Sequence, residues 1–448
     1  MDNSKKGKAL RQKVNRKKHA IARSGTNRPS IIDMIRESDE DRVPELIPVR
    51  HARMSVSPFT FYRGTAGIMA RDLAQLPNTG IIVQAIGDCH LMNFGGFATP
   101  ERTLIFDAND FDETTPAPWE WDVKRLATSF VLASRNNQLK RQDAYDIAHL
   151  MVQSYLQHIS AFSKMDILDL WYMKFDLETM RKNAKNERMK QMISQGIIDA
   201  QKSTSQKVFY KITADTMGQR TITEQPPLIY HTLDIKKDHA MIESFMDEYE
   251  HTLQADRRFL LKQYKLVDAA LKVVGVGSVG TRCYVALMMN EMQHPLFLQI
   301  KEARQSVLAP YTVAGNYNHN GQRVVEGQRL VQAASDIFLG WATGEEGRHF
   351  YIRQLRDRKI APDVEHFDRE LLTAYAGLCG RMLARAHAKT GNAAMISEYA
   401  GRKSNTLVTA LTEFAVTYAD QTEKDYAAYM QAIKDGVFTV QEVAEMKK

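Results

Sequence analysis

Apolar and polar residues follow two different periodicities along this chain. Runs rich in β-branched and aromatic residues predict strands in residues 263–360. The clearest of these runs are Cys283–Leu287, Leu296–Lys301 and His349–Leu355. In residues 361–448, apolar side chains recur every three to four positions, which predicts helices. The helix Leu371–His387 shows this spacing at Leu371, Tyr375, Leu378 and Met382.

The first half of the chain has shorter strand patterns and longer helical ones. Strands are predicted at 80–85 and 104–106, followed by a helix over Trp119–Arg135. Residues 136–262 have mostly helical patterns, with a break at Gln225–Tyr230, where two prolines stand together. A further helix is predicted over Arg323–Ala334.

These patterns divide the chain into five segments, and no internal repeat is found. The predicted segments are a basic, disordered tail and lead-in (1–45), a part with a catalytic loop and a metal site (46–135), a mostly helical insertion (136–262), a strand-rich nucleotide-binding part (263–360) and C-terminal helices (361–448). The fold class expected from this order is α+β.

Composition agrees with a globular protein large enough for two lobes. The chain has 448 residues, of which 44% are hydrophobic and 25% charged. Its three cysteines, Cys89, Cys283 and Cys379, lie far apart, so neither a disulfide framework nor a zinc site is indicated. No run of about 18 apolar residues and no apolar core of a signal peptide is found, which predicts a cytoplasmic protein without a membrane span.

Positive charge is concentrated at the N-terminus. Residues 1–30 contain ten Lys or Arg against Asp2, a net charge of +9, whereas the whole chain has a formal charge of +7. Such a block is typical of a solvated, disordered arm. It could also bind an anionic partner, such as nucleic acid or lipid, without specificity.

A glycine-rich turn in the strand-rich segment is the first candidate for chemistry. Gly275, Gly277 and Gly280 form a G-x-G-x-x-G pattern that includes Ser278. In a dinucleotide-binding protein this pattern opens a helix. Here it leads into the predicted strand Cys283–Leu287, and a glycine turn between two strands is typical of a flap that covers nucleotide phosphates.

A lysine follows the glycine turn at the spacing used by kinases. Lys301 ends an apolar strand about 20 residues after the glycines. It is predicted to contact the α- and β-phosphates of ATP, and Glu326 on the next helix is predicted to orient it. Glu302 is an alternative partner, and a plain surface lysine is the other interpretation.

A base and a metal site are predicted in the first half of the chain. Asp88 is followed five positions later by Asn93, and an acidic cluster, Asp107 to Glu113, follows an apolar strand. In kinase-type phosphotransferases the loop Asp receives the acceptor proton, and the Asn and a later Asp bind Mg²⁺. Asp110 is the preferred metal ligand and Asp107 the alternative. A turn residue, a helix cap and a solvated acidic loop are the competing structural interpretations.

The sequence resembles a bacterial family of unknown function that is grouped with the protein-kinase-like superfamily. The resemblance rests on Ser57–Gly64, Gly87–Asn93, Asp107–Glu113 and Gln299–Ala303, and extends over nearly all of the chain after residue 45. The motifs are also similar to those of aminoglycoside and choline phosphotransferases, in which a helix with an internal Asp follows the acidic strand end. Asp122 is implied to be this residue and to brace the catalytic loop. The resemblance implies a fold and a site layout but no particular activity.

The sequence departs from the kinase pattern in two ways. Ile86 stands where a kinase usually has His or Tyr, and the catalytic loop comes before the glycine turn rather than after it. A circular permutation would explain this order, because the ends of a domain often lie close together. The helix Leu371–His387 would then be the one that normally runs into the catalytic loop. The resemblance thus implies a permuted, two-lobed kinase-like fold with a helical insertion.

Two further side chains have open roles. Arg63 is either a substrate or phosphate contact or a residue at the edge of the core, and His90 either contacts substrate or packs within its loop. The function predicted from all these residues is Mg²⁺- and ATP-dependent phosphoryl transfer to a hydroxyl group, with a small molecule as the favoured acceptor. Nucleotidyl (AMP) transfer to a protein and a non-catalytic binding scaffold remain as alternatives.

Overall fold

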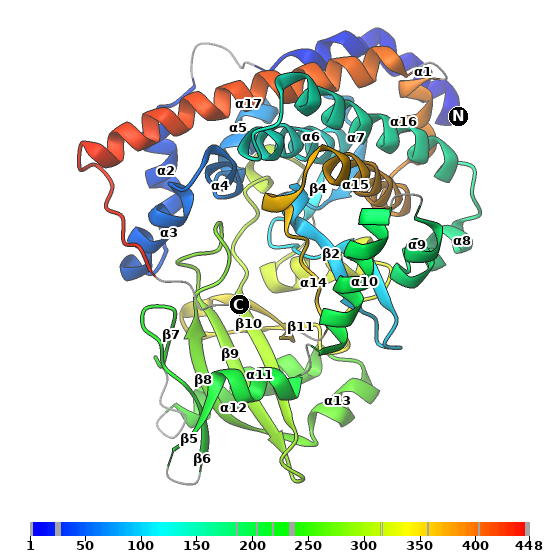
Figure 1. Cartoon of the computed structure of the whole chain (residues 1–448). Helices are drawn as coiled ribbons and strands as arrows, with labels where there is room; N and C mark the ends of the chain where they lie inside the picture. Colours follow the sequence, from blue (N-terminus) through cyan, green and yellow to red (C-terminus); the bar gives the residue numbers. More distant parts are fainter. Residues whose placement is uncertain are drawn as a thin grey trace.

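The computed structural model describes residues 3–22, 28–184, 187–202, 205–216, 219–232, 238–313, 315, 317–355, 358–401 and 404–443. Within these residues the chain forms a helical part and a part built on a sheet, which lie one above the other in Figure 1. The predicted α+β class is confirmed. No described helix is both long and apolar enough to cross a membrane. Asp2 and Arg23 of the basic segment lie outside the described residues.

The sheet part contains one six-stranded antiparallel sheet with the strand order β11-β12-β10-β9-β8-β7. Its strands are β7 (Ile229–Tyr230), β8 (Tyr264–Lys272), β9 (Cys283–Asn290), β10 (Pro295–Glu302), β11 (Gly340–Thr343) and β12 (His349–Gln354). The strands predicted at 283–287, 296–301 and 349–355 are therefore confirmed. Lys301 on β10 lies between Cys283 of β9 and Tyr351 of β12.

Helices and a hairpin pack on this sheet and bury both of its faces. Helix α14 contacts β11 and β12, α12 contacts β11, and α11 contacts β10, whereas the hairpin β5–β6 continues from α11 toward β8. Their bounds are α11 (Ser205–Ile212), β5 (Thr213–Thr216), β6 (Gln219–Ile222), α12 (His239–His251), α13 (Ala255–Leu261), α14 (Asn320–Val331) and η5 (Glu345–Gly347). Leu298 and Phe297, neighbours on β10, belong to separate clusters on the two faces, as the alternation of side chains in a strand requires.

The helical part is built around four long helices, α6, α7, α15 and α17, with the shorter ones at its edges (Figure 1). Their bounds are α6 (Trp119–Asn136), α7 (Arg141–Phe162), α8 (Ile167–Tyr172), α9 (Leu177–Asn183), α10 (Glu187–Lys202), η6 (Val364–His366), α15 (Arg369–Thr390), α16 (Ala393–Ala400) and α17 (Asn405–Lys434). All but the last two residues of α6 are buried. The predicted helices at 119–135 and 371–387 are confirmed.

Two small antiparallel sheets lie in the helical part and carry the loops of interest. Strand β1 (Ile82–Ala85) pairs with β4 (Thr115–Pro118), and β2 (Phe94–Ala98) pairs with β3 (Leu104–Ala108). The turn from β1 to β2 includes η3 (Leu91–Asn93) and contains Asp88. The turn from β3 to β4 contains the acidic cluster. Antiparallel pairing therefore brings both turns to the same region of the molecule.

The N-terminal segment differs from the expected disordered tail. Within residues 1–45 it forms α1 (Asn3–Lys13), η1 (Arg16–Ala20) and α2 (Ile31–Asp39). The helices η2 (Pro44–Leu46), α3 (Ile47–Met54), α4 (Pro58–Arg63) and α5 (Ala66–Ala74) follow. Arg11 Nε donates to Tyr399 O at 2.9 Å, and Arg16 Nη1 donates to Ala400 O at 2.6 Å. These cations thus satisfy carbonyls at the C-terminal end of α16, a favourable place for positive charge. The sequence could not predict that these arginines bind the end of α16, because a run of cations looks the same whether its side chains are solvated or cap a helix.

Candidate active site

The glycine turn, residues 273–282, joins β8 to β9 as predicted. Gly275 and Gly280 have φ values of 67° and 86°, in the region that favours glycine. A Cβ atom on Gly277 would lie 3.2 Å from the backbone oxygen of Arg63, which ends α4. The glycines therefore let the turn fold back closely onto the helical part.

Arginines from the N-terminal helices bind the backbone of this turn. Arg42 Nη1 donates to Gly277 O at 2.9 Å, and Arg53 Nη1 donates to Gly275 O at 2.5 Å. The pairs are separated by 235 and 222 positions in the chain. No local signal in the sequence could have shown these contacts, which attach the turn to the N-terminal helices.

The loop that contains Asp88 is braced from α6 in the way that the resemblance implies. The carboxylate of Asp122 accepts hydrogen bonds from the backbone N–H of Ile86 at 2.7 Å and of Gly87 at 3.0 Å. Asn93 Nδ2 donates to the backbone oxygen of Asp88 at 2.5 Å, so the two predicted site residues of this loop are directly linked. The buried Asp122 thereby holds the loop in a fixed shape.

The carboxylate of Asp88 has one close cationic partner. Its Oδ1 lies 2.5 Å from Nη2 and 2.7 Å from Nε of Arg125, a buried residue of α6 for which no role was predicted. Its Oδ2 lies 3.6 Å from His90 Nε2. Burial and the nearby guanidinium groups of Arg63 and Arg125 lower the pKa of His90 well below its usual value, so His90 is neutral. Arg125 therefore fixes one oxygen of Asp88, and the second oxygen is less engaged.

The carboxylates of Asp110 and Asp112 share the ammonium of Lys301. Lys301 Nζ lies 2.5 Å from Asp112 Oδ2 and 3.8 Å from Asp110 Oδ1. Asp112 also accepts from the hydroxyl of Tyr351 at 2.6 Å and from that of Ser278 at 3.2 Å. Burial alone would lower the pKa of Lys301, but the two carboxylates raise it well above its usual value. Lys301 is therefore a permanent cation beside Asp110, whose side chain is 38% exposed.

The predicted pair of Lys301 and Glu326 is not formed. Glu326 lies on α14, as predicted, but its carboxylate accepts a hydrogen bond from Gln322 Nε2 at 2.7 Å. Lys301 is oriented by Asp112 instead. The alternative partner, Glu302, binds Arg282 and Arg348 at 3.4 and 2.9 Å. The acid that holds the lysine thus comes from the acidic cluster itself.

Asp107, the alternative metal ligand, is part of the interior. Its side chain is 1% exposed, and its two oxygens lie 2.9 and 2.8 Å from Nη2 of Arg385, which is fully buried. The backbone N–H groups of Ala108 and Ala333 donate to the same carboxylate at 2.9 Å each. With these partners Asp107 ties α15 and the end of α14 to β3.

Glu113 ends the acidic cluster in a protected position. Its Oε2 accepts a hydrogen bond from the backbone N–H of Val307 at 2.7 Å, and its backbone oxygen accepts one from Ser306 Oγ at 2.7 Å. Burial raises the pKa of Glu113 to about 7, although the bond from Val307 works in the opposite direction. The segment between β10 and α14 is thereby attached to the acidic turn.

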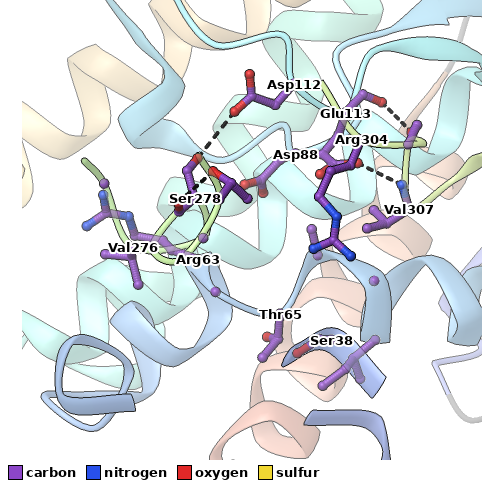
Figure 2. A pocket seen from close by; sticks show the side chains of 18 of the residues that line it. Ser38, Arg63, Thr65, Asp88, Asp112, Glu113, Val276, Ser278, Arg304 and Val307 are labelled. Carbon is purple, nitrogen blue, oxygen red and sulfur yellow. Dashed lines mark hydrogen bonds between the residues drawn. The ribbon is translucent and has the colours of Figure 1, made fainter. Parts of the chain in front are cut away.

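One pocket brings most of the predicted residues together. It has a volume of about 420 Å³ and lies between the glycine turn, the Asp88 loop, the acidic turn and helices α2 to α5 (Figure 2). The predicted residues that line it are Arg63, Asp88, His90, Asn93, Asp110, Gly275, Gly277 and Ser278. Asp107, Gly280, Lys301 and Glu326 do not line it, but Lys301 contacts its wall through Asp110 and Asp112.

The oxygen atoms of this pocket suit a hard cation that is also bound by phosphate. Among the described residues, no group of three or more His, Cys, Asp or Glu side chains has an arrangement that could hold a metal ion. Magnesium bound with a nucleotide needs only one or two carboxylates besides the phosphates and water. Asp110 supplies one such carboxylate, and Asn93 presents an amide oxygen on the wall of the same pocket. The cation of Lys301 already lies against the same acidic turn.

The sequence matches the DUF2252 family, described as "Uncharacterized protein conserved in bacteria", over residues 42–432. The chain belongs to this family. The resemblance to a bacterial family of unknown function is therefore confirmed, and the matched region of this DUF2252 protein includes every predicted site residue. No curated protein and no solved structure gives a significant match to the chain.

Proposed function

We propose that this DUF2252 protein is an ATP- and Mg²⁺-dependent phosphotransferase with a circularly permuted, protein-kinase-like fold. The sheet part supports this fold. Strands β8, β9 and β10 are neighbours, the glycine turn joins the first two, and Lys301 lies near the end of the third. Helix α14 follows before β11 and β12 complete the sheet. Kinases hold the phosphates of ATP with a glycine-rich loop, a lysine on the third strand and a following helix.

The helical part supports the permuted order of the chain. Thr390 at the end of α15 accepts a hydrogen bond from the backbone N–H of Gln84 in β1 at 3.2 Å. His387, one turn earlier, has its Nε2 3.2 Å from Oδ2 of Asp122. Helix α15 therefore ends beside the strand that leads into the Asp88 loop. In an unpermuted kinase a helix runs directly into the catalytic loop. A permuted chain must therefore keep the end of that helix, here α15, beside the strand that begins the loop.

The observation that carries the proposal is that one pocket joins the glycine turn to Asp88, Asn93 and Asp110. These groups come from distant parts of the chain, and each has a defined use in phosphoryl transfer. The glycine turn and Lys301 would hold the nucleotide phosphates. Asn93 and Asp110 would hold Mg²⁺, which neutralises phosphate charge when bound.

Asp88 has the position of a proton acceptor. It lines the pocket as a carboxylate, and Arg125 fixes its Oδ1. An acceptor hydroxyl within hydrogen-bond reach of the other oxygen would be oriented and partly deprotonated by it. In this proposal Asp112 takes the orienting role that the sequence assigned to Glu326, because Asp112 is the acid that contacts Lys301.

Thermal unfolding with and without Mg²⁺-ATP tests this function. At about 100 times its Kd, a ligand that binds only the folded state adds about 2.7 kcal/mol to the free energy of unfolding. We expect the wild type to show a Mg²⁺-dependent rise in Tm that Lys301→Ala and Asp110→Asn both lose. Lys262→Ala and Asp256→Asn are matched controls on the exposed surface around α13, and both should keep the rise.

The products then separate the kinds of transfer. Release of ADP with phosphate on an acceptor supports phosphoryl transfer, whereas a product that carries AMP favours nucleotidyl transfer. The absence of any shift in the wild type at millimolar Mg²⁺-ATP contradicts the proposal and favours a binding scaffold. A shift that survives in both Lys301→Ala and Asp110→Asn would place the nucleotide elsewhere.

A further inference from the structure

The glycine turn has an uneven set of backbone hydrogen bonds. All six carbonyl oxygens of residues 275–280 accept a hydrogen bond. The N–H groups of four residues that line the pocket, however, donate to no acceptor within the described part of the chain: Gly275, Val276, Gly277 and Ser278. Successive unpaired N–H groups in a turn form a site that favours an anion. The turn thus has its acceptors occupied and its donors available.

Arg42 saturates two of these carbonyls. Its Nη1 donates to Gly277 O at 2.9 Å and to Val279 O at 2.5 Å, and its Nε donates to Ser38 O at the end of α2 at 2.8 Å. A Cβ atom on Gly280 would lie 3.0 Å from the Cβ of Arg42, so the glycine permits this close approach. One guanidinium therefore joins the end of α2 to the backbone of the turn.

Two more carbonyls are held from the same side of the molecule. Arg53 Nη1 of α3 donates to Gly275 O at 2.5 Å, and the backbone N–H of Val43 donates to Gly280 O at 2.8 Å. The remaining two carbonyls accept from N–H groups within the turn. Four of the six carbonyls are thus occupied by groups that lie outside the sheet part.

These bonds also set the direction of the free N–H groups. In a planar trans peptide the N–H points opposite to the C=O. The bond to Gly277 O therefore turns the N–H of Ser278 away from Arg42, and the bond from Arg53 does the same for the N–H of Val276. A carbonyl that accepts from a cation also polarises its peptide, which makes the N–H a stronger donor.

We propose that Arg42 is a positioning residue of the phosphate site, which holds the carbonyls of Gly277 and Val279 so that the N–H groups of the turn are available to a polyphosphate. The assignment rests on the proposed function, in which the turn binds the phosphates of ATP. A turn that became ordered only on binding would lose affinity to the entropy of ordering, and a turn held in advance avoids this loss. The N-terminal helices are therefore part of the active site.

Inorganic tripolyphosphate with Mg²⁺ is the probe for this role, because it has the phosphates of ATP without the nucleoside. By isothermal titration we expect Arg42→Gln to bind it about 10-fold more weakly than the wild type, the equivalent of ordering one backbone residue on binding. Arg42→Lys should keep most of the affinity, because both bonds to the turn come from a single nitrogen and an ammonium has three N–H donors. Arg36→Gln, an exposed change on α2 outside the pocket, is the matched control and should bind as the wild type does.

Two readouts separate the position of the turn from the charge of Arg42, which also lines the pocket. The difference between the wild type and Arg42→Gln should persist at about 1 M salt, where the Debye length is about 3 Å and more distant charges are screened. At saturating tripolyphosphate, amide exchange at Val276 and Ser278 should slow in the wild type and in Arg42→Lys. It should slow much less in Arg42→Gln, because its N–H groups are no longer held in place.

Equal binding by the wild type and Arg42→Gln, or a difference that disappears at high salt, would overturn the positioning role and leave the phosphotransferase intact. No binding of tripolyphosphate to the wild type would overturn it as well. Failure of the proposed function gives another result, in which tripolyphosphate binds and depends on Arg42 but Mg²⁺-ATP supports no transfer. If Arg42→Gln does not fold, Arg53→Gln replaces it, since it removes only the bond to Gly275 O, and binding equal to the wild type would again overturn the proposal.

Discussion

Asp107 and Asp110 stand three positions apart in one acidic cluster, but they lie in different surroundings. Asp107 is 1% exposed and has a fully buried arginine and two backbone N–H groups as partners. Asp110 is 38% exposed, lines the pocket and has Lys301 at 3.8 Å as its cation. The first belongs to the interior of the helical part, and the second faces the pocket.

The number of partners, rather than the charge, separates these two carboxylates. A buried carboxylate needs its charge and lone pairs satisfied within the protein, and Arg385 with two N–H groups does this for Asp107. A metal ligand must keep lone pairs available, and Asp110 does. The same difference holds within the pocket, where Asp112 has three side-chain partners and Asp110 has one.

The largest expected effect is the loss of the interior pair. Asp107→Asn leaves the cation of Arg385 buried without an anion, which should lower the free energy of unfolding by about 3–5 kcal/mol. Asp110→Asn, the same change three positions on, removes a partly exposed pair and should cost less than about 1 kcal/mol. Urea denaturation of the two variants measures both values. Similar losses in the two variants would contradict the distinction drawn between them.

Glu113, which also lines the pocket, should make the stability of the protein depend on pH. Its pKa in the folded protein, about 7, is higher than the usual 4.5 because the group is buried. The folded state therefore binds the proton more tightly, so the stability from this group is complete below pH 4.5 and is lost as pH rises through 7. A shift of this size corresponds to about 3 kcal/mol at most.

Glu113→Gln removes this titration and keeps an oxygen that can accept from Val307. Between pH 5 and pH 8 the wild type should lose more stability than the Gln variant, with the steepest difference at about pH 6, between the two pKa values, and a levelling off above the folded-state pKa of about 7. Denaturant midpoints across this range give the difference directly. Parallel pH profiles for the two proteins would show that Glu113 does not titrate in this range.

The sequence predicted the local elements well, for a physical reason. Strand and helix patterns, the glycine turn and the Asp88 loop are set by neighbours in the chain. The bracing role of Asp122 was implied by the resemblance to phosphotransferases, and its bonds to Ile86 and Gly87 are present. The candidate pocket residues in these two loops followed from the same short-range patterns.

The partners of those residues could not be predicted, because they are set by packing between distant segments. Arg385 lies 278 positions after Asp107, and nothing local marks either as half of a buried pair. Lys301 was assigned to Glu326 by analogy, but Asp112, 189 positions earlier in the chain, is closer.

The smallest expected effect concerns Ser278, which links the glycine turn to the pocket carboxylates. Its hydroxyl donates to Asp112 Oδ2 at 3.2 Å, a contact at the long end of the hydrogen-bond range. Ser278→Ala should therefore lower the free energy of unfolding by only about 0.5–1 kcal/mol. Amide exchange in residues 276–280 should become faster, because one of the contacts that hold the turn is gone.

Thr281→Ala is the matched control within the same turn. Its hydroxyl donates to the backbone oxygen of Ser278 at 2.8 Å and has no contact with the acidic turn. We expect a similar small loss of stability from Thr281→Ala, whereas Ser278→Ala should in addition loosen the link to the acidic turn that its bond to Asp112 provides. A loss for Ser278→Ala as large as that for Asp107→Asn would mean that the pocket carboxylates are tied into the fold as firmly as the interior pair. The contrast between Asp107 and the pocket carboxylates would then fail, because Asp110 and Asp112 would be structural groups as well.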